Sequence, residues 1–440
     1  MRIKIALVSR CEIIINNPVT IPSLDQKTNS FQLLYCGSES LDWGTAIRGI
    51  LRAGFGIPDW PQFRDRVVMP TFLGRTAVWQ LCRIWKLGSG DEILMPAYNC
   101  GTEVDPFLVS GCKVTLYRVD KNAKIDVLDI IRRRSDRTKV VYVTHYFGWS
   151  QNLDELLPWC RRHGLRLVED CALALFSNSN EGPLGTVGDA AIFSLGKFLP
   201  VPAGGLLTLR SANGLNIPSL EHWPVKESLL RAFILFRKDL QRKLEVLGLY
   251  TPLRRLKIRK AVRNVSRDST TLAGIEPVRP DMPKDYYLDP RLKNKEMPPI
   301  SIGIFNSIGS TVVNRRRANY LELQSRIEHI KTLAPLFVHL HKGTCPMAFP
   351  VLSPKRRELV RMLESHGVCA YPFWEGYHRN LDWTDFPEAR MLKDNLLTLP
   401  VNQSLSTAHM RFISRLLSDA EVKANCRNES DMDSLLRRWQ

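Results

Sequence analysis

Apolar runs and helical patterns alternate through the middle of the chain. The runs predict strands, and these lie at Ile93–Pro96, Lys113–Tyr117, Val140–Thr144, Leu165–Val168, Ala190–Leu195 and Leu206–Leu209. Between them, apolar residues recur every three or four positions and predict helices at Thr76–Trp85, Glu103–Val109, Val127–Arg133 and Leu153–Arg162. Such alternation predicts an α/β fold with a mostly parallel sheet covered by helices on both faces.

A second unit with the same kind of pattern begins near residue 300. It predicts helices and strands, in the order helix Ser310–Ile330, strand Met347–Leu352, helix Pro354–Ser365, strand Val368–Phe373 and helix Ser406–Leu417. The chain therefore divides into a large domain (46–210) and a smaller C-terminal α/β domain (300–420). An extension (1–45), an insertion (211–299) and a polar tail (421–440) remain outside these two domains.

Lys197 stands out because it follows a predicted strand and precedes a stiff loop. Pro200 and Pro202 fix the backbone after it, and Gly204-Gly205 opens the next strand. Upstream, the strand Leu165–Val168 ends in Glu169-Asp170, which places a carboxylate at the carboxyl edge of the sheet, where α/β proteins bind ligands. A lysine amine and a carboxylate for a ring nitrogen are the groups that pyridoxal phosphate chemistry requires.

A phosphate site is the third requirement, and the turn Gly74-Arg75-Thr76 offers one. It opens the predicted helix, whose first amide groups and positive dipole end favour an anion. Thr76 adds a hydroxyl group and Arg75 a charge.

In these segments the chain resembles the DegT/StrS family of pyridoxal-phosphate-dependent sugar aminotransferases, of the fold type I superfamily. The resemblance covers about half of the chain, from Phe72 to Arg210 and from Met347 to Leu417. It rests on GRTA (74–77), GDEILMPAYNCGTEVDPFLVSGCKV (90–114), RTKVVYVTHYFGWSQNLDEL (137–156), HGLRLVEDCA (163–172) and the flanks of Lys197. It implies that Lys197 carries the cofactor and that Asp170 holds the ring nitrogen. Ser194 and the turn at Gly74 match phosphate contacts, and His145 matches a histidine near the active site.

The chain also departs from the family pattern. Leu173 stands where relatives usually carry Gln or His beside the cofactor. Cys100 occupies the place of a ring-stacking aromatic residue, with Tyr98 as the alternative. The loop that reaches the partner subunit has no clear match, and Asn306 or Asn314 are the alternatives; Trp374 and Arg379 are substrate contacts by position alone.

Composition agrees with an enzyme of 440 residues, 44% of them apolar. Ten cysteines without CxxC pairs indicate a reducing cytoplasm, and the sequence contains no long apolar run typical of a membrane span. We expect neither a metal nor a nucleic-acid partner, because no metal-ligand motif and no basic motif with interleaved aromatic residues accompany these features.

The insertion is strongly basic. Residues 226–267 hold thirteen Lys and Arg against three acidic residues, a net charge of +10 out of +18 for the chain. Apolar positions from Leu229 to Leu247 fall at helical spacing, so the segment begins as an amphipathic helix. Two interpretations stay open: a helix packed on the body with a solvated basic face, or peripheral contact with an anionic membrane.

The resemblance implies a homodimeric aminotransferase with its active site at the subunit interface. It would move an amino group from an amino acid, glutamate by family analogy, to a keto-sugar that is linked to a nucleotide, in polysaccharide or secondary-metabolite biosynthesis. A sugar dehydratase on the same scaffold is an alternative, but family dehydratases replace the lysine by histidine. A catalytically silent scaffold protein is the other alternative.

Overall fold

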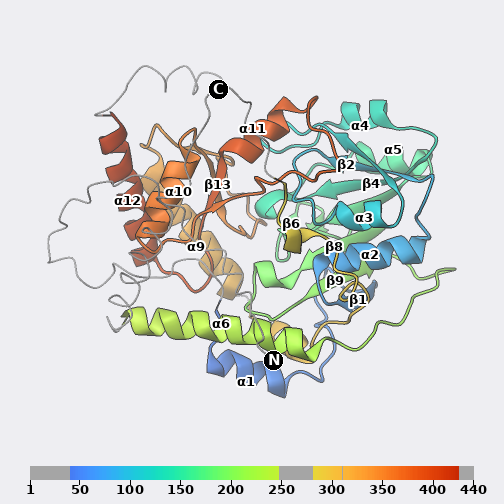
Figure 1. The fold of residues 1–440 in the computed structure, drawn as a ribbon, viewed down its shortest axis with the longest axis horizontal. Helices are drawn as coiled ribbons and strands as arrows, with labels where there is room; N and C mark the ends of the chain where they lie inside the picture. Colours follow the sequence, from blue (N-terminus) through green and yellow to red (C-terminus); the bar gives the residue numbers. More distant parts are fainter. Residues whose placement is uncertain (1–39, 247–280, 310, 426–440) are drawn as a thin grey trace, which may run out of the picture.

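A computed structural model describes residues 40–246, 281–309 and 311–425 of the chain. Two sheets organise it: a seven-stranded sheet in the large domain and a four-stranded sheet in the small domain (Figure 1). The predicted N-terminal extension and polar tail lie almost wholly outside the described residues, as do residues 247–280 of the insertion.

The large sheet is mostly parallel, as predicted. Its strands run in the order β1-β9-β8-β5-β4-β2-β3. Their bounds are β1 Val67–Thr71, β2 Glu92–Pro96, β3 Lys113–Tyr117, β4 Thr138–Thr144, β5 Arg166–Asp170, β8 Ala190–Ser194 and β9 Gly205–Leu209. Strands β3, β2, β4, β5 and β8 pair in parallel, whereas β9 is antiparallel to both β8 and β1. The six predicted strands are confirmed, and β1 was missed.

Helices cover this sheet on both faces, which explains its continuous apolar strands. The helices are α2 Gly74–Trp85, α3 Asp105–Val109, α4 Val127–Arg133 and α5 Leu156–Arg162. Residues Val140–Val143 of β4 are fully buried, because both sides of the strand face core. Asp126 caps α4 by accepting a hydrogen bond from the backbone N–H of Asp129 at 2.9 Å. Each of the four predicted helices is confirmed.

The small domain contains an antiparallel sheet in the order β10-β11-β13-β12. Its elements are α9 Thr311–Ile327, β10 Ala334–Pro335, β11 Phe349–Leu352, α10 Arg356–Ser365, β12 Tyr371–Pro372, α11 Pro387–Asn395, β13 Leu396–Leu399 and α12 Thr407–Asn425. The predicted strand Val368–Phe373 shrinks to two residues at the sheet edge, where Pro372 has no N–H to donate. The central strand β13 was missed.

Three more helices lie beside the β1 edge of the large sheet: α1 Trp43–Leu51, α6 Val225–Val246 and α8 Pro299–Asn306 (Figure 1). Helices α1 and α8 pack backbone to backbone, since a Cβ on Gly303 would overlap the carbonyl of Gly49. Short hairpin strands β6 Asn178–Ser179 and β7 Gly182–Pro183 and the 3-10 turns η1 Tyr146–Gly148, η2 Leu195–Lys197 and η3 Lys284–Tyr286 complete the described chain. None of the described helices combines the length and apolarity needed to cross a lipid bilayer.

Candidate active site

Lys197 ends the 3-10 turn η2, directly after strand β8. The turn is closed by the backbone N–H of Phe198, which donates to the carbonyl of Leu195 at 3.0 Å. Within the described residues the side-chain amine makes no hydrogen bond or ion pair; it faces two aromatic rings, with Nζ 5.9 Å from the centre of Phe373 and 5.7 Å from that of Trp374. The strand, turn and loop order predicted around Lys197 therefore presents an unpaired amine at the carboxyl edge of the sheet.

Asp170 is the last residue of β5, aligned with Thr144 at the end of β4. Its carboxylate is buried and accepts a hydrogen bond from the backbone N–H of Ala172 at 2.9 Å. Burial, and then the charge of Glu103, raise the pKa of Asp170 to about 6, while Lys197 acts in the opposite direction. A buried carboxylate with a raised pKa favours a cation beside it, so this site suits a protonated ring nitrogen.

Buried polar atoms without partners surround this edge of the sheet. Among the described residues, the hydroxyl group of Thr144 and the amide oxygen of Asn99 are buried without a hydrogen bond. Such orphaned atoms are rare in folded proteins and indicate a missing ligand or water. Together with Lys197 and Asp170, they fit a polar aromatic cofactor such as pyridoxal phosphate.

The predicted phosphate turn lies next to Ser194, as expected. A Cβ placed on Gly74 would stand 3.7 Å from the Cβ of Ser194, and Gly205 lacks room for any side chain against Leu73. A glycine at position 205, the first residue of β9, is therefore needed to let the backbone before α2 approach this strand.

The side chains of this turn point elsewhere, which the sequence did not predict. Arg75 donates to the carbonyls of Asp285 and Tyr287, at 2.6 and 3.2 Å, and Thr76 donates to that of Leu292 at 3.3 Å. Only the backbone N–H groups at the start of α2 are left to bind an anion. We therefore assign the phosphate contact to the backbone of this turn rather than to the two side chains.

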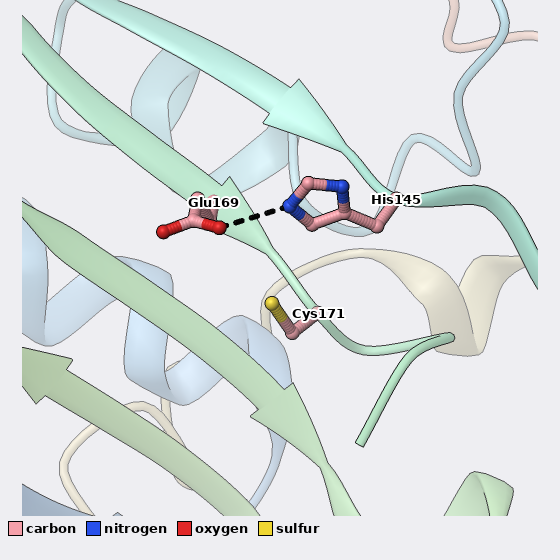
Figure 2. A group of neighbouring side chains, drawn as sticks. All are labelled: His145, Glu169 and Cys171. Carbon is pink, nitrogen blue, oxygen red and sulfur yellow. Dashed lines mark hydrogen bonds and ion pairs between the residues drawn. The ribbon is translucent and has the colours of Figure 1, made fainter. Parts of the chain in front are cut away.

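His145 lies in a buried cluster with Glu169 and Cys171, in which its ring points at the Glu169 carboxylate (Figure 2). Its Nδ1 accepts a hydrogen bond from the backbone N–H of Gln151 at 3.0 Å, so Nε2 carries the proton and donates to Glu169 at 3.0 Å. Both ring nitrogens of His145 are thus engaged in hydrogen bonds. We propose that His145 positions the end of β4 instead of transferring protons.

Tyr98 and Cys100 were the two alternatives for the residue stacked on the cofactor ring. Tyr98 is fully buried, and its hydroxyl group donates to the carbonyl of Phe373 at 3.3 Å. Cys100 is also buried, and its thiol is close enough to Lys197 for the two to influence each other electrostatically. Leu173 is fully buried and adds no polar group. The stacking residue stays a prediction, with both alternatives beside the site.

Trp374 was predicted as a contact from its position alone, and in the structure its ring lies beside the amine of Lys197. Its backbone has φ of +57°, a left-handed conformation that non-glycine residues adopt at a cost. The ring of Trp374 packs against that of Tyr98, with centroids 5.3 Å apart. Arg379, the other positional candidate, is exposed and instead donates to the hydroxyl group of Tyr287 at 3.0 Å.

Lys393, which the sequence did not single out, holds the Trp374 loop in place. It is fully buried on α11, and its Nζ donates to the carbonyls of Asn99, Trp374 and Gly376 at 2.8, 3.1 and 2.9 Å. Burial lowers its pKa to about 8. No local pattern marks this lysine, because its acceptors come from two domains.

We expect Trp374→Ala to raise the rate at which an amine-reactive reagent labels Lys197 by about fivefold. The substitution removes a ring that shields the amine. It also removes the cation–π contact between this ring and the protonated amine, which stabilises the protonated form by about 1 kcal/mol. Peptide mass spectrometry of partly labelled protein measures the rate. Trp223→Ala, a half-buried tryptophan outside this cluster, is the matched control. Equal labelling of the wild type and the Trp374 variant would show that the ring does not cover the amine.

Comparisons with known proteins match part of this chain. Residues 74–214 match the model of the DegT/DnrJ/EryC1/StrS aminotransferase family. A GDP-perosamine synthase of Vibrio cholerae is 29% identical over 125 residues, which cover 28% of this chain and 34% of that protein. A putative L-glutamine:3-amino-2,3-dideoxy-scyllo-inosose aminotransferase of Micromonospora echinospora is 31% identical over 159 residues, which cover 35% of this chain and 38% of that protein.

The fold as a whole is also shared. A putative sugar aminotransferase of Streptococcus pneumoniae, solved in its PLP form, superposes with a TM-score of 0.61 at 16% identity, covering 88% of this chain and 98% of that one. By sequence, in contrast, the chain matches only about a third of the length of these two curated relatives. Residues 74–214, which hold Lys197, Asp170 and the first turn of α2, therefore match the model of the DegT/DnrJ/EryC1/StrS aminotransferase family, and the chain shares its fold with a solved putative sugar aminotransferase.

Proposed function

We propose that the protein is a pyridoxal-phosphate-dependent aminotransferase that transfers an amino group from an amino acid to a cyclic keto-sugar. The observation that carries this proposal is the unpaired amine of Lys197 at the same sheet edge as the buried carboxylate of Asp170, within the segment that matches the family. The homodimer, the cytoplasmic location and the glutamate donor expected from the sequence belong to the same proposal.

The residues present would hold the cofactor at three points. Lys197 would bind it covalently, Asp170 would bind its ring nitrogen, and the backbone N–H groups at the start of α2 would bind its phosphate. Pyridoxal phosphate, when bound, supplies a carbonyl carbon that amines attack and a ring that accepts charge from the neighbouring carbon.

The side chains of this protein would then perform two tasks. Once a donor amine has displaced Lys197, the Nζ of Lys197 is free to accept a proton from the α-carbon of the donor. The same amine would return a proton during the reaction with the keto-sugar. Trp374 and Phe373 cover this amine, exclude water and offer flat apolar surfaces to a sugar ring.

The relatives support the acceptor class. One is named for a GDP-linked amino sugar, and the other for an amino transfer from L-glutamine to an inosose. Both names share a six-membered polyhydroxylated ring, so we propose a cyclic hydroxyketone as acceptor, with a nucleotide-linked keto-sugar as the first compound to test. Glutamate and glutamine are the donors to compare.

A transfer assay tests this function. Purified protein with pyridoxal phosphate is incubated with each donor and with GDP- or dTDP-linked keto-sugars, and mass spectrometry detects the amino sugar. An amino sugar formed only with both donor and cofactor supports the proposal. If no donor converts the bound cofactor to its amine form, even without an acceptor, the proposed activity is wrong and the scaffold alternative gains support.

We expect Asp170→Asn to weaken binding of pyridoxal phosphate about 10- to 100-fold at pH about 8, since a hydrogen bond to a charged group contributes about 1.5–3 kcal/mol. As pH falls through about 6, the carboxylate of the wild type takes up a proton and no longer contributes to the affinity for the cofactor. The variant lacks this contribution at every pH. Titration of cofactor-free protein with pyridoxal phosphate, followed by absorbance between pH about 5 and 8, measures the affinity.

The phosphate group of the cofactor also titrates near pH 6, so wild type and variant must be compared at each pH. Glu103→Gln is the matched variant, because it removes the neighbouring charge that raises the pKa of Asp170 and should shift the midpoint to lower pH. Equal affinities of the wild type and Asp170→Asn across this range would contradict the assignment of Asp170.

A further inference from the structure

Helices α1 and α6 lie side by side at the lower edge of the molecule in Figure 1. The backbone N–H of Leu41 donates to the carbonyl of Leu235 at 3.3 Å, and the rings of Trp43 and Phe236 are 4.8 Å apart. One face of α6 is directed inward, where Ser228 and Asp239 are buried. The two helices thus form one continuous outer surface.

That surface is apolar and exposed. Of the sixteen exposed large apolar residues in the described part of the chain, ten lie on α1, on α6 or just after α1. We call these ten the apolar face: Trp43, Ile47, Ile50, Leu51, Phe55, Val225, Leu229, Leu230, Phe233 and Leu240. Trp43 is 70% exposed, and Leu229 and Phe233 are each 62% exposed. Contiguous exposure on this scale marks an interaction surface, because single exposed apolar residues are ordinary but clusters are costly in water.

Positive charges border the apolar face. On α6, Lys226 and Lys243 are exposed and Lys238 is half-buried; on α1, Arg48 and Arg52 are exposed. Lys243 pairs with Asp239 at 2.7 Å, whereas no ion pair is found for the other four within the described residues. The positive charge of this border therefore favours a partner whose surface is anionic.

A second copy of the chain fits this surface poorly. A symmetric dimer pairs a surface with itself, so it would bring two basic borders together in a chain whose net charge is already +18. A lipid bilayer with anionic head groups removes the same apolar side chains from water and also neutralises the basic border. With 22 residues, α6 is about 33 Å long and lies along such a surface instead of crossing it.

We propose that the apolar face is a docking surface for an anionic lipid bilayer. The amphipathic helix predicted from the sequence is confirmed, and the structure adds what the sequence left open: the helix buries one side, leaves an apolar stripe exposed and joins it to that of α1. The surface does not include Lys197 or Asp170, so membrane docking is independent of the proposed catalytic activity.

Vesicle sedimentation of the full-length chain tests this surface. We expect binding to vesicles rich in phosphatidylglycerol, weak binding to pure phosphatidylcholine, and loss of binding as salt is added. Leu229→Glu with Phe233→Glu should lower the partition coefficient by about 100-fold. Lys226→Gln with Lys238→Gln should lower it by about fivefold for each charge removed.

The matched control is Leu128→Glu with Leu321→Glu, two exposed leucines on α4 and α9 away from the apolar face. This control should bind vesicles as the wild type does. Light scattering of the same variants without lipid reports the oligomeric state. Absence of binding to anionic vesicles, or equal loss in the control, would overturn the proposal. So would a dimeric wild type that the Leu229/Phe233 variant turns into monomers while vesicle binding is unchanged, because the face would then be a subunit interface.

Discussion

Replacing Lys197 with alanine is expected to lower amino transfer by at least about 10³-fold, because the side chain serves both as covalent anchor and as proton carrier. The described structure offers no substitute amine: Lys393, a buried lysine beside the site, directs its Nζ to three backbone carbonyls. Turnover of an amino donor, with a keto-sugar present, measures the loss. Borohydride treatment of the loaded wild type should add the mass of the reduced cofactor to the peptide that contains Lys197.

Two variants separate this effect from damage to the fold. Lys197→Arg keeps the positive charge but loses the nucleophilic amine, so it should be as inactive as the alanine variant. Lys139→Ala, an exposed lysine on β4, should behave as the wild type. If the alanine variant still transfers amino groups at a comparable rate, or if borohydride fixes the cofactor to another residue, Lys197 is not the anchor.

Glu169→Ala is expected to destabilise the large domain by at least about 4 kcal/mol. The buried carboxylate accepts four hydrogen bonds: from the backbone N–H groups of Gly185, Val187 and Gly188 at 3.0, 2.8 and 2.6 Å, and from His145 at 3.0 Å. Alanine leaves these four donors buried without a partner, at a cost of about 1–3 kcal/mol each. Since domains are stable by only about 5–15 kcal/mol, this loss would remove a large part of the free energy of unfolding.

Denaturation in urea, followed by circular dichroism, measures this loss. Glu181→Ala, an exposed glutamate between the hairpin strands β6 and β7, should change the free energy of unfolding by less than about 0.5 kcal/mol. Glu169→Gln should lie between the two, because it keeps one acceptor oxygen but turns an NH₂ group toward donors. A stability of Glu169→Ala within about 1 kcal/mol of the wild type would show that the network is not needed for folding.

The lowered pKa of Glu169 predicts how the stability of the protein depends on pH. Burial alone would raise the pKa of Glu169, but the hydrogen bonds from His145 and from the backbone N–H groups of Gly188 and Gly185 outweigh it and lower the pKa below its ordinary 4.5. A lowered pKa in the folded state adds stability above pH 4.5 that is lost as pH falls through the folded-state value. This contribution should be missing in Glu169→Gln.

The sequence by itself determined six of the seven strands of the large sheet and the positions of Asp170 and Lys197 at the ends of two of them. Apolar runs such as Val140–Val143 predicted strands because a parallel sheet buried on both faces requires continuous apolar residues. The strand ends then placed Asp170 and Lys197 at one edge, because parallel strands share their carboxyl ends. The glycine pair Gly204-Gly205 was also visible in the sequence, but the close contact of Gly205 with Leu73 that requires a glycine is set by the tertiary structure.

Only the tertiary structure decided where long side chains point and what covers the reactive lysine. Arg75 and Thr76 bind carbonyls of residues 285–292, more than 200 positions away in the sequence, so no local pattern could direct them. Trp374 reaches Lys197 through a left-handed backbone that the buried Lys393 holds from another element. The central strand β13 was equally hidden, since it is a short apolar run that follows α11 without a turn residue.

For the amphipathic helix α6, too, the sequence determined one part of the structure and the tertiary contacts decided another. Its periodicity and charge followed from the sequence, because both depend on residues within one turn of each other. Which of its faces is buried depends on contacts of Leu235 and Phe236 with residues near α1, and these are set by packing between distant segments. The sequence thus fixes what each segment can form, and the tertiary contacts select which of its surfaces remain available for binding.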